Sequence, residues 1–123
     1  MGTWRCALFK NTWTPDITQQ FVSNLVPATY ESTGTNYVRK TLTGQTITVD
    51  LALNRADHYA DSLTWTALTS TDFRYAVIYI FGTVDTDSVL HSYYDFGPQA
   101  VTALDFVLKW NGAVTNGVVF RGA

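Results

Sequence analysis

The stretch Tyr75-Ala76-Val77-Ile78-Tyr79-Ile80-Phe81 is almost continuously apolar and is rich in aromatic and β-branched residues. Residues of these kinds favour strands. An apolar run without polar alternation predicts a strand that is buried on both faces. We therefore expect a strand over residues 73–81, with one face packed on the core and the other covered by the helix, a loop or a neighbouring subunit.

Shorter segments with alternating apolar and polar residues surround this run, and a period of two is typical of strands with one buried face. In residues 46–51, Ile47, Val49 and Leu51 fall on one face, and Thr46, Thr48 and Asp50 fall on the other. The predicted strands are residues 4–9, 37–42, 46–51, 63–67, 73–81, 89–96, 102–110 and 118–120.

Turn signals separate the predicted strands. Gly97-Pro98 is expected to end one strand, and Asn111-Gly112 is a strong hairpin signal. Residues 54–62 are polar and hold two aspartates, so we expect a connection there and no core element.

One short helix is predicted near residues 16–25. Asp16 and Gln19 fit a capping box, because an acidic residue is followed three positions later by an amide. Pro27 is expected to close the helix. The apolar residues at helical spacing are Ile17, Phe21, Val22 and Leu25.

Many short strands in close succession, without helical crossovers, predict a mainly all-β fold. We expect an antiparallel β-sandwich or barrel of about seven or eight strands. The chain has 123 residues, which suits a single β-sandwich domain over residues 1–123.

Composition excludes several classes of protein. Hydrophobic residues make up 46% and charged residues 15%, which excludes a disordered chain. The net charge is −2 and no basic patch is present, so no nucleic-acid partner is expected. The single cysteine, Cys6, permits no internal disulfide. The longest apolar run is far shorter than the roughly 20 residues that span a bilayer, so no membrane partner is expected either.

Ionisable residues offer few candidates for catalysis or metal binding. Asp57, His58 and Asp61 lie close together in the sequence, but we interpret them as a solvated turn whose aspartates bond to the local backbone. Asp85 and Asp87 resemble a fragment of a calcium loop that lacks its glycine and glutamate positions.

The remaining reactive groups have structural interpretations as well. We expect His91 to pack half-buried within a strand and Cys6 to be a buried structural thiol. No nucleophile elbow and no phosphate loop is present in the sequence. We therefore predict no catalytic, cofactor-binding or metal-binding residues, no cofactor and no enzymatic activity.

The aromatic residues have two interpretations. Tyr75, Tyr79, Tyr93 and Tyr94 could line a surface that binds sugar or peptide. Low charge combined with many aromatic residues is also typical of interface cores. We favour packing and assembly over ligand binding.

Several ordered motifs carry a family resemblance. They are Arg39-x-x-Leu42-x-Gly44, Ala60-Asp61 followed by Thr64-Trp65-Thr66-Ala67, the strand Ala76-Val77-Ile78-Tyr79, the segment 90–97, and the late strand 106–110 that ends at a tryptophan. Residues 7–16 and 21–25 fit the same order. Over nearly its whole length, the chain resembles a family of small structural proteins of tailed bacteriophages.

The resemblance implies a virion component, and a capsid decoration (cement) protein is the expected role. The implied partners are the major capsid protein and further copies of the chain, with a homotrimer as the expected oligomer. The implied location is the virion, assembled in the cytoplasm of the bacterial host. The alternatives are a tail or neck component, or a β-sandwich that binds a carbohydrate or a receptor.

Overall fold

The computed structural model describes residues 2–16 and 18–110 in full and the backbone of residues 116–122. Strands make up 56% of the chain, which confirms the all-β class. All strand pairs with a defined register are antiparallel. The strands are β1 (Trp4–Phe9), β2 (Lys40–Thr41), β3 (Thr46–Asp50), β4 (Arg55–Asp61), β5 (Leu63–Ile80), β6 (Val89–Leu108) and β7 (Asn116–Gly122).

The strands form two sheets within two compact units. The first unit comprises Met1–Thr41 and Trp65–Asp105, and the second comprises Leu42–Thr64 and Phe106–Ala123. One sheet has the order β2-β1-β5-β6 and the other has the order β3-β4-β7. Of the three chain boundaries between the units, one follows β2 and the other two fall inside the long strands β5 and β6. Face-to-face packing of the sheets in a single sandwich domain stays a prediction.

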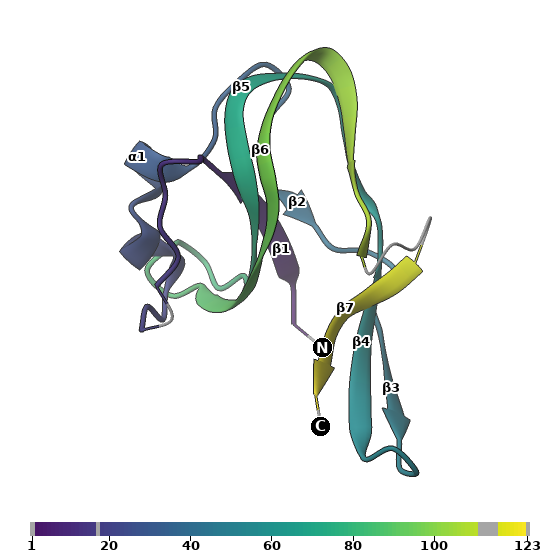
Figure 1. Ribbon diagram of the computed structural model, residues 1–123. Helices are drawn as coiled ribbons and strands as arrows, with labels where there is room; N and C mark the ends of the chain where they lie inside the picture. The colour runs from purple at the N-terminus through teal and green to yellow at the C-terminus, as the bar shows by residue number, and fades with distance from the viewer. Residues whose placement is uncertain (1, 17, 111–115, 123) are drawn as a thin grey trace. The chain divides into compact units, whose positions relative to one another are not determined.

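Strand β1 forms the centre of the first unit, between β2 and β5 (Figure 1). Its residues 6–9 are completely buried. The register with β5 runs from Trp4 opposite Ile80 to Phe9 opposite Tyr75. Residues 75–79 of β5 are buried without interruption, which confirms the prediction that this apolar run is covered on both faces.

One face of this sheet is covered by the segment between β1 and β2. Trp13, Val22 and Leu25 from this segment pack in one buried cluster with side chains of β1 and β5. The rings of Phe9 and Trp13 lie 5.2 Å apart between centroids. Burying such large apolar side chains contributes about 1.5–3 kcal/mol each, so this segment is tied to the sheet. The sheet residues of the cluster are Ala7, Phe9, Tyr75, Val77 and Tyr79.

The helical segments differ from the prediction. A 3-10 helix, η1 (Val22–Leu25), is followed by a four-residue helix, α1 (Pro27–Tyr30). The Asp16 carboxylate accepts hydrogen bonds from the Thr18 backbone N–H (2.9 Å) and hydroxyl (2.6 Å), so it closes a local turn and caps no helix. Pro27 begins α1 instead of ending the predicted helix, because proline is favoured in the first helical turn.

The two long strands were each predicted as two shorter strands. Residues 63–67 and 73–81 belong to the continuous strand β5, and residues 89–96 and 102–110 fall largely within β6. Gly97-Pro98 therefore does not end its strand. Strand β6 lies at the edge of its sheet, and an edge position tolerates a proline because no ladder hydrogen bond is lost on the open side.

Irregular backbone positions allow the long strands to bend together within the first unit (Figure 1). Ala67 and Ala103 have φ angles of 49° and 50°. For each of these alanines, a side chain of the neighbouring strand accepts a hydrogen bond from the backbone N–H. The Ala67 N–H donates to the Asp105 carboxylate (2.9 Å), and the Ala103 N–H donates to the Thr69 hydroxyl (2.9 Å). These reciprocal bonds replace ladder bonds that the bends remove.

In the second unit, the prediction for residues 54–62 is wrong. Residues 54–62 were expected to form a connection, but β4 occupies Arg55–Asp61 and pairs with both β3 and β7. The polar composition of these residues did not indicate a strand, because β4 lies between β3 and the distant strand β7, which pair with both of its edges. In the first unit, the strand predicted over residues 37–42 is shorter in the structure, where β2 comprises only Lys40–Thr41. The predicted strand 118–120 lies within β7, and the predicted Asn111-Gly112 hairpin lies outside the described residues.

Candidate functional site

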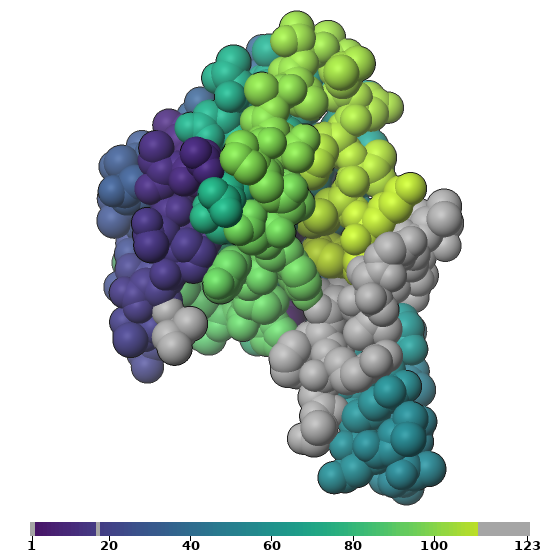
Figure 2. Space-filling view, in the orientation of Figure 1, coloured from purple at the N-terminus to yellow at the C-terminus, as the bar shows by residue number. Residues whose placement is uncertain are grey.

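Among the side chains of the second unit that the structure describes, the most exposed large apolar ones belong to the hairpin formed by β3 and β4. Ile47 and Val49 of β3 are 56% and 63% exposed, and Leu51 and Leu53 of the connecting turn are 87% and 59% exposed. We call these four residues the hairpin patch. Figure 2 shows part of this hairpin in teal at the lower right. The strand predicted over residues 46–51 is confirmed for Thr46–Asp50, whereas Leu51 lies in the turn, and within β3 every residue but Asp50 is exposed.

Polar residues build the turn that presents the two leucines. The Asp50 carboxylate accepts the Leu53 N–H at 3.1 Å, and the Leu51 carbonyl accepts the Asn54 N–H at 3.4 Å. Asn54 has a φ of 51°, a left-handed conformation that asparagine tolerates better than most residues. Local hydrogen bonds thus hold the backbone of the turn, while the side chains of Leu51 and Leu53 are exposed to solvent.

Strand β3 is also an edge strand, since the sheet order is β3-β4-β7. An edge strand presents unpaired backbone N–H and C=O groups, and proteins usually protect such edges with charges, prolines or covering segments. Within β3 only Asp50 is charged and no proline is present. Exposed apolar residues on an unprotected edge are typical of a surface that another protein covers.

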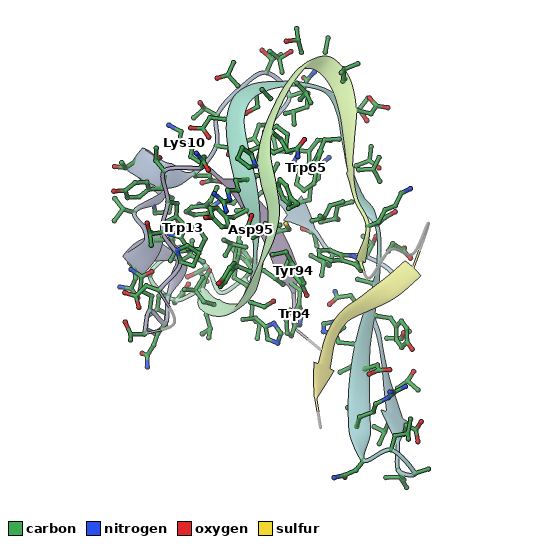
Figure 3. The ribbon with its side chains drawn as sticks, viewed as in Figure 1. Trp4, Lys10, Trp13, Trp65, Tyr94 and Asp95 are labelled. Carbon is green, nitrogen blue, oxygen red and sulfur yellow. The ribbon has the colours of Figure 1, made fainter. Side chains whose placement is uncertain are left out.

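A second candidate site is a pocket of about 400 Å³ in the first unit. Figure 3 shows Trp13 between the segment that follows β1 and the strands β5 and β6. The Trp13 ring meets the rings of Tyr75 and Tyr93 edge to face, at centroid distances of 5.1 and 5.9 Å. The residues that line the pocket are Trp13, Asp16, Gln19, Leu25, Val77, Leu90, His91, Ser92 and Tyr93.

The four tyrosines considered in the sequence divide between core and surface. Tyr75 and Tyr79 are buried. Tyr93 is 45% exposed and faces the pocket, whereas Tyr94, which is half-buried, follows it in the same strand. Burial raises the pKa of Tyr94. The pocket could not be predicted from the sequence, because no sequence pattern links Trp13, in the segment after β1, to β6.

The predicted solvated turn at Asp57 and His58 is wrong, because both residues are 5% exposed within β4. The His58 Nε2 lies 3.1 Å from the Gln45 Oε1, and burial lowers the pKa of His58. Asp57 lies 3.8 Å from Arg55, and the Asp61 carboxylate accepts the Thr43 hydroxyl at 3.4 Å. No group of three or more His, Cys, Asp or Glu side chains within residues 2–16 and 18–110 could hold a metal ion.

Asp85 belongs to a polar network of the first unit. The Arg39 guanidinium donates to the Asp85 carboxylate at 2.6 Å and to the Glu31 carboxylate at 2.8 Å. The Tyr37 hydroxyl donates to Glu31 and accepts the Leu8 N–H at 3.0 Å. Burial, followed by the nearby Glu31 charge, raises the pKa of Tyr37. The network holds the segment before β2 against β1, so its role is structural.

The last two candidate residues from the sequence, Asp87 and Cys6, have structural roles. The Asp87 carboxylate accepts the Thr83 and Val84 N–H groups at 2.8 and 2.9 Å, which closes the loop before β6. The Thr83 hydroxyl, followed by these N–H groups, lowers the pKa of Asp87. Cys6 is completely buried, as predicted, and burial raises the pKa of its thiol.

Comparison with known proteins adds no family. The chain matches no family model, no curated protein and no solved structure. No helix among the described residues is both long and apolar enough to cross a membrane. The chemistry of the two sites, an apolar hairpin and an aromatic pocket with polar groups, is suited to binding.

Proposed function

We propose that the chain is a structural protein of a tailed-bacteriophage particle and that it acts as a capsid decoration protein. In this role the hairpin patch packs against the major capsid protein. The observation that carries the proposal is the exposure of four aliphatic residues on an edge hairpin. The sequence motifs described above supply the class of particle.

The size of the patch favours attachment at several points. Burying an aliphatic side chain that is already partly covered contributes roughly 1–2 kcal/mol. Association of two proteins costs an estimated 4–15 kcal/mol in lost freedom of movement. One hairpin patch therefore gives weak attachment. Several linked copies bind much more tightly without any new kind of contact, which supports a homotrimer that engages the capsid with three hairpins.

Low charge is compatible with this role. The chain has 8 basic and 10 acidic residues among 123, so long-range electrostatic attraction to a partner is weak. Interfaces that form between neighbouring subunits are depleted of charge at their cores. The proposal accordingly places the chain in the virion, assembled in the host cytoplasm, without catalytic activity, nucleic acid or membrane as a partner.

A capsid-binding experiment tests the proposal. Purified protein is mixed with capsids that lack the chain, and cosedimentation is measured for the wild type, for Ile47→Thr/Val49→Thr and for Val84→Thr. Both variants keep β-branched residues at exposed positions, and Val84, which is 57% exposed, lies outside the hairpin. We expect the double variant to lose roughly tenfold to hundredfold in affinity, and the Val84 variant to bind as the wild type does.

Two results would overturn the proposal. One is equal binding by all three proteins or by none of them. The other is absence of the chain from purified particles when these are analysed by mass spectrometry. An electron-microscopy map of the particle distinguishes a head position from the tail or neck, and sedimentation of the free protein tests the trimer.

A further inference from the structure

We infer that the pocket of the first unit binds a neutral saccharide. This inference goes beyond the proposed assembly role and rests on different residues, because none of the pocket residues belongs to the hairpin patch. Its volume of about 400 Å³ lies within the range of small-molecule sites, roughly 300–1,000 Å³.

The aromatic residues of the pocket give it an apolar wall. Trp13 is 6% exposed and is held in place by Phe9 and Tyr75, with ring centroids 5.2 and 5.1 Å away. Tyr93 extends this wall into solvent, since 45% of its surface is exposed. A pyranose ring has apolar C–H faces that pack against an aromatic ring, while a tyrosine keeps its hydroxyl in contact with water.

Polar groups line the rest of the pocket with both donors and acceptors. Ser92 supplies a hydroxyl and His91 an imidazole whose Nδ1 lies 3.0 Å from that hydroxyl. Gln19 donates its amide N–H to the Asn24 carbonyl at 3.0 Å, which orients the amide, and its buried Oε1 has no hydrogen-bond partner among the described residues.

The charge of the lining distinguishes between classes of ligand. Among the described residues that line the pocket, Asp16 is the single charged one, and none is a lysine or arginine. Hydrogen bonds from the Thr18 hydroxyl and N–H lower the pKa of Asp16, so the carboxylate is ionised at neutral pH. Phosphates and other anions are therefore repelled. A carboxylate accepts hydrogen bonds from neighbouring sugar hydroxyls, and the mixture of donors and acceptors suits a polyol better than an ammonium group, which only donates.

The test uses the full chain and four probes, namely glucose, galactose, mannose and N-acetylglucosamine, at about 10 mM, a concentration that detects a Kd near 1 mM. Binding is measured by saturation-transfer NMR and calorimetry for the wild type, Tyr93→Ala and Val89→Ala. Val89 is the matched control because it lies in the same strand, is also 45% exposed and does not line the pocket.

We expect at least one saccharide to bind the wild type and Val89→Ala, with at least a tenfold loss in Tyr93→Ala. The inference is overturned if no probe binds, if Tyr93→Ala binds as well as the wild type, or if choline, a cationic probe, binds instead of the sugars. Capsid cosedimentation of Tyr93→Ala separates the two proposals, because the assembly role predicts unchanged attachment whatever the result with sugars.

Discussion

Among the glycines that the structure describes, Gly34 has the least room for an added side chain. It has a φ of 147°, and an added Cβ would lie 1.9 Å from the Thr69 carbonyl oxygen. That carbonyl accepts the Thr35 N–H at 2.9 Å, and the Thr69 N–H donates back to Thr35. The glycine thus allows the segment before β2 to approach β5 closely.

We predict that Gly34→Ala lowers the free energy of unfolding by about 2–4 kcal/mol, because the backbone strain and the displaced bridge act together. Gly97→Ala is the control. Gly97 has a φ of 85°, but a Cβ there meets nothing within 4 Å, so the loss is about 1–2 kcal/mol. Urea denaturation measures both values, and equal losses would show that the contact with Thr69 has no effect.

Cys6 provides a probe of the core at the same scale. The thiol is completely buried and its raised pKa keeps it protonated, and the thiolate is the reactive form. We predict that a thiol reagent labels the native protein only at the rate of unfolding and labels the protein at once in urea. Rapid labelling under native conditions would show that β1 opens locally.

At the scale of elements, the bends of β5 and β6 depend on side chains that replace ladder hydrogen bonds. We predict that Thr69→Val destabilises the protein by about 1 kcal/mol, because it removes the acceptor of the Ala103 N–H and keeps the shape of the side chain. Thr71→Val, at an exposed position of the same strand, is expected to change stability by no more than about 0.5 kcal/mol. Thermal denaturation compares the two variants, and a larger effect at position 71 contradicts the prediction.

Strand β4 makes stability dependent on pH through His58. Burial lowers the pKa of this histidine in the folded state, whereas an unfolded chain has a histidine pKa of about 6.5. Below that pH the unfolded state binds more protons, so stability is fully present above about pH 6.5 and is lost as the pH falls toward the folded pKa.

We predict that the melting temperature of the wild type falls between neutral and mildly acidic pH by more than that of His58→Asn. Melting curves across this range measure the difference. A parallel fall in both proteins would show that His58 is not responsible.

At the scale of the whole molecule, stability is distributed unevenly. All residues of β3 except Asp50 are exposed, whereas residues 6–9 of β1 are completely buried. Local opening requires the least free energy where few apolar contacts hold the backbone. We predict that hydrogen exchange is fastest at the amides of β3 and slowest at those of β1, as NMR or mass spectrometry measures.

The same experiment responds to assembly. Protection of β3 is expected to increase when the chain is attached to a capsid, because a partner covers the edge strand. Strong protection of β3 in dilute free protein would contradict this prediction.

Local sequence pattern was sufficient to predict the class of the fold and one of its buried strands. The run Tyr75 to Phe81 contains enough aromatic and β-branched residues to predict a strand, and its lack of alternation predicts burial on both faces. Strand β1 and the alternation of Ile47 and Val49 were likewise visible, because a period of two depends only on neighbouring residues. Nothing local indicated that this alternation belongs to an exposed edge.

Contacts between distant parts of the chain determine which faces are covered and where strands continue. Strand β5 passes through Ala67 because Asp105, 38 residues away, accepts its N–H. The pocket exists because Trp13 meets Tyr93 from a distant strand. Alternation states which residues share a face, but burial of that face depends on partners that folding brings together across long separations. For that reason the hairpin patch and the pocket follow from the structure and not from the sequence pattern.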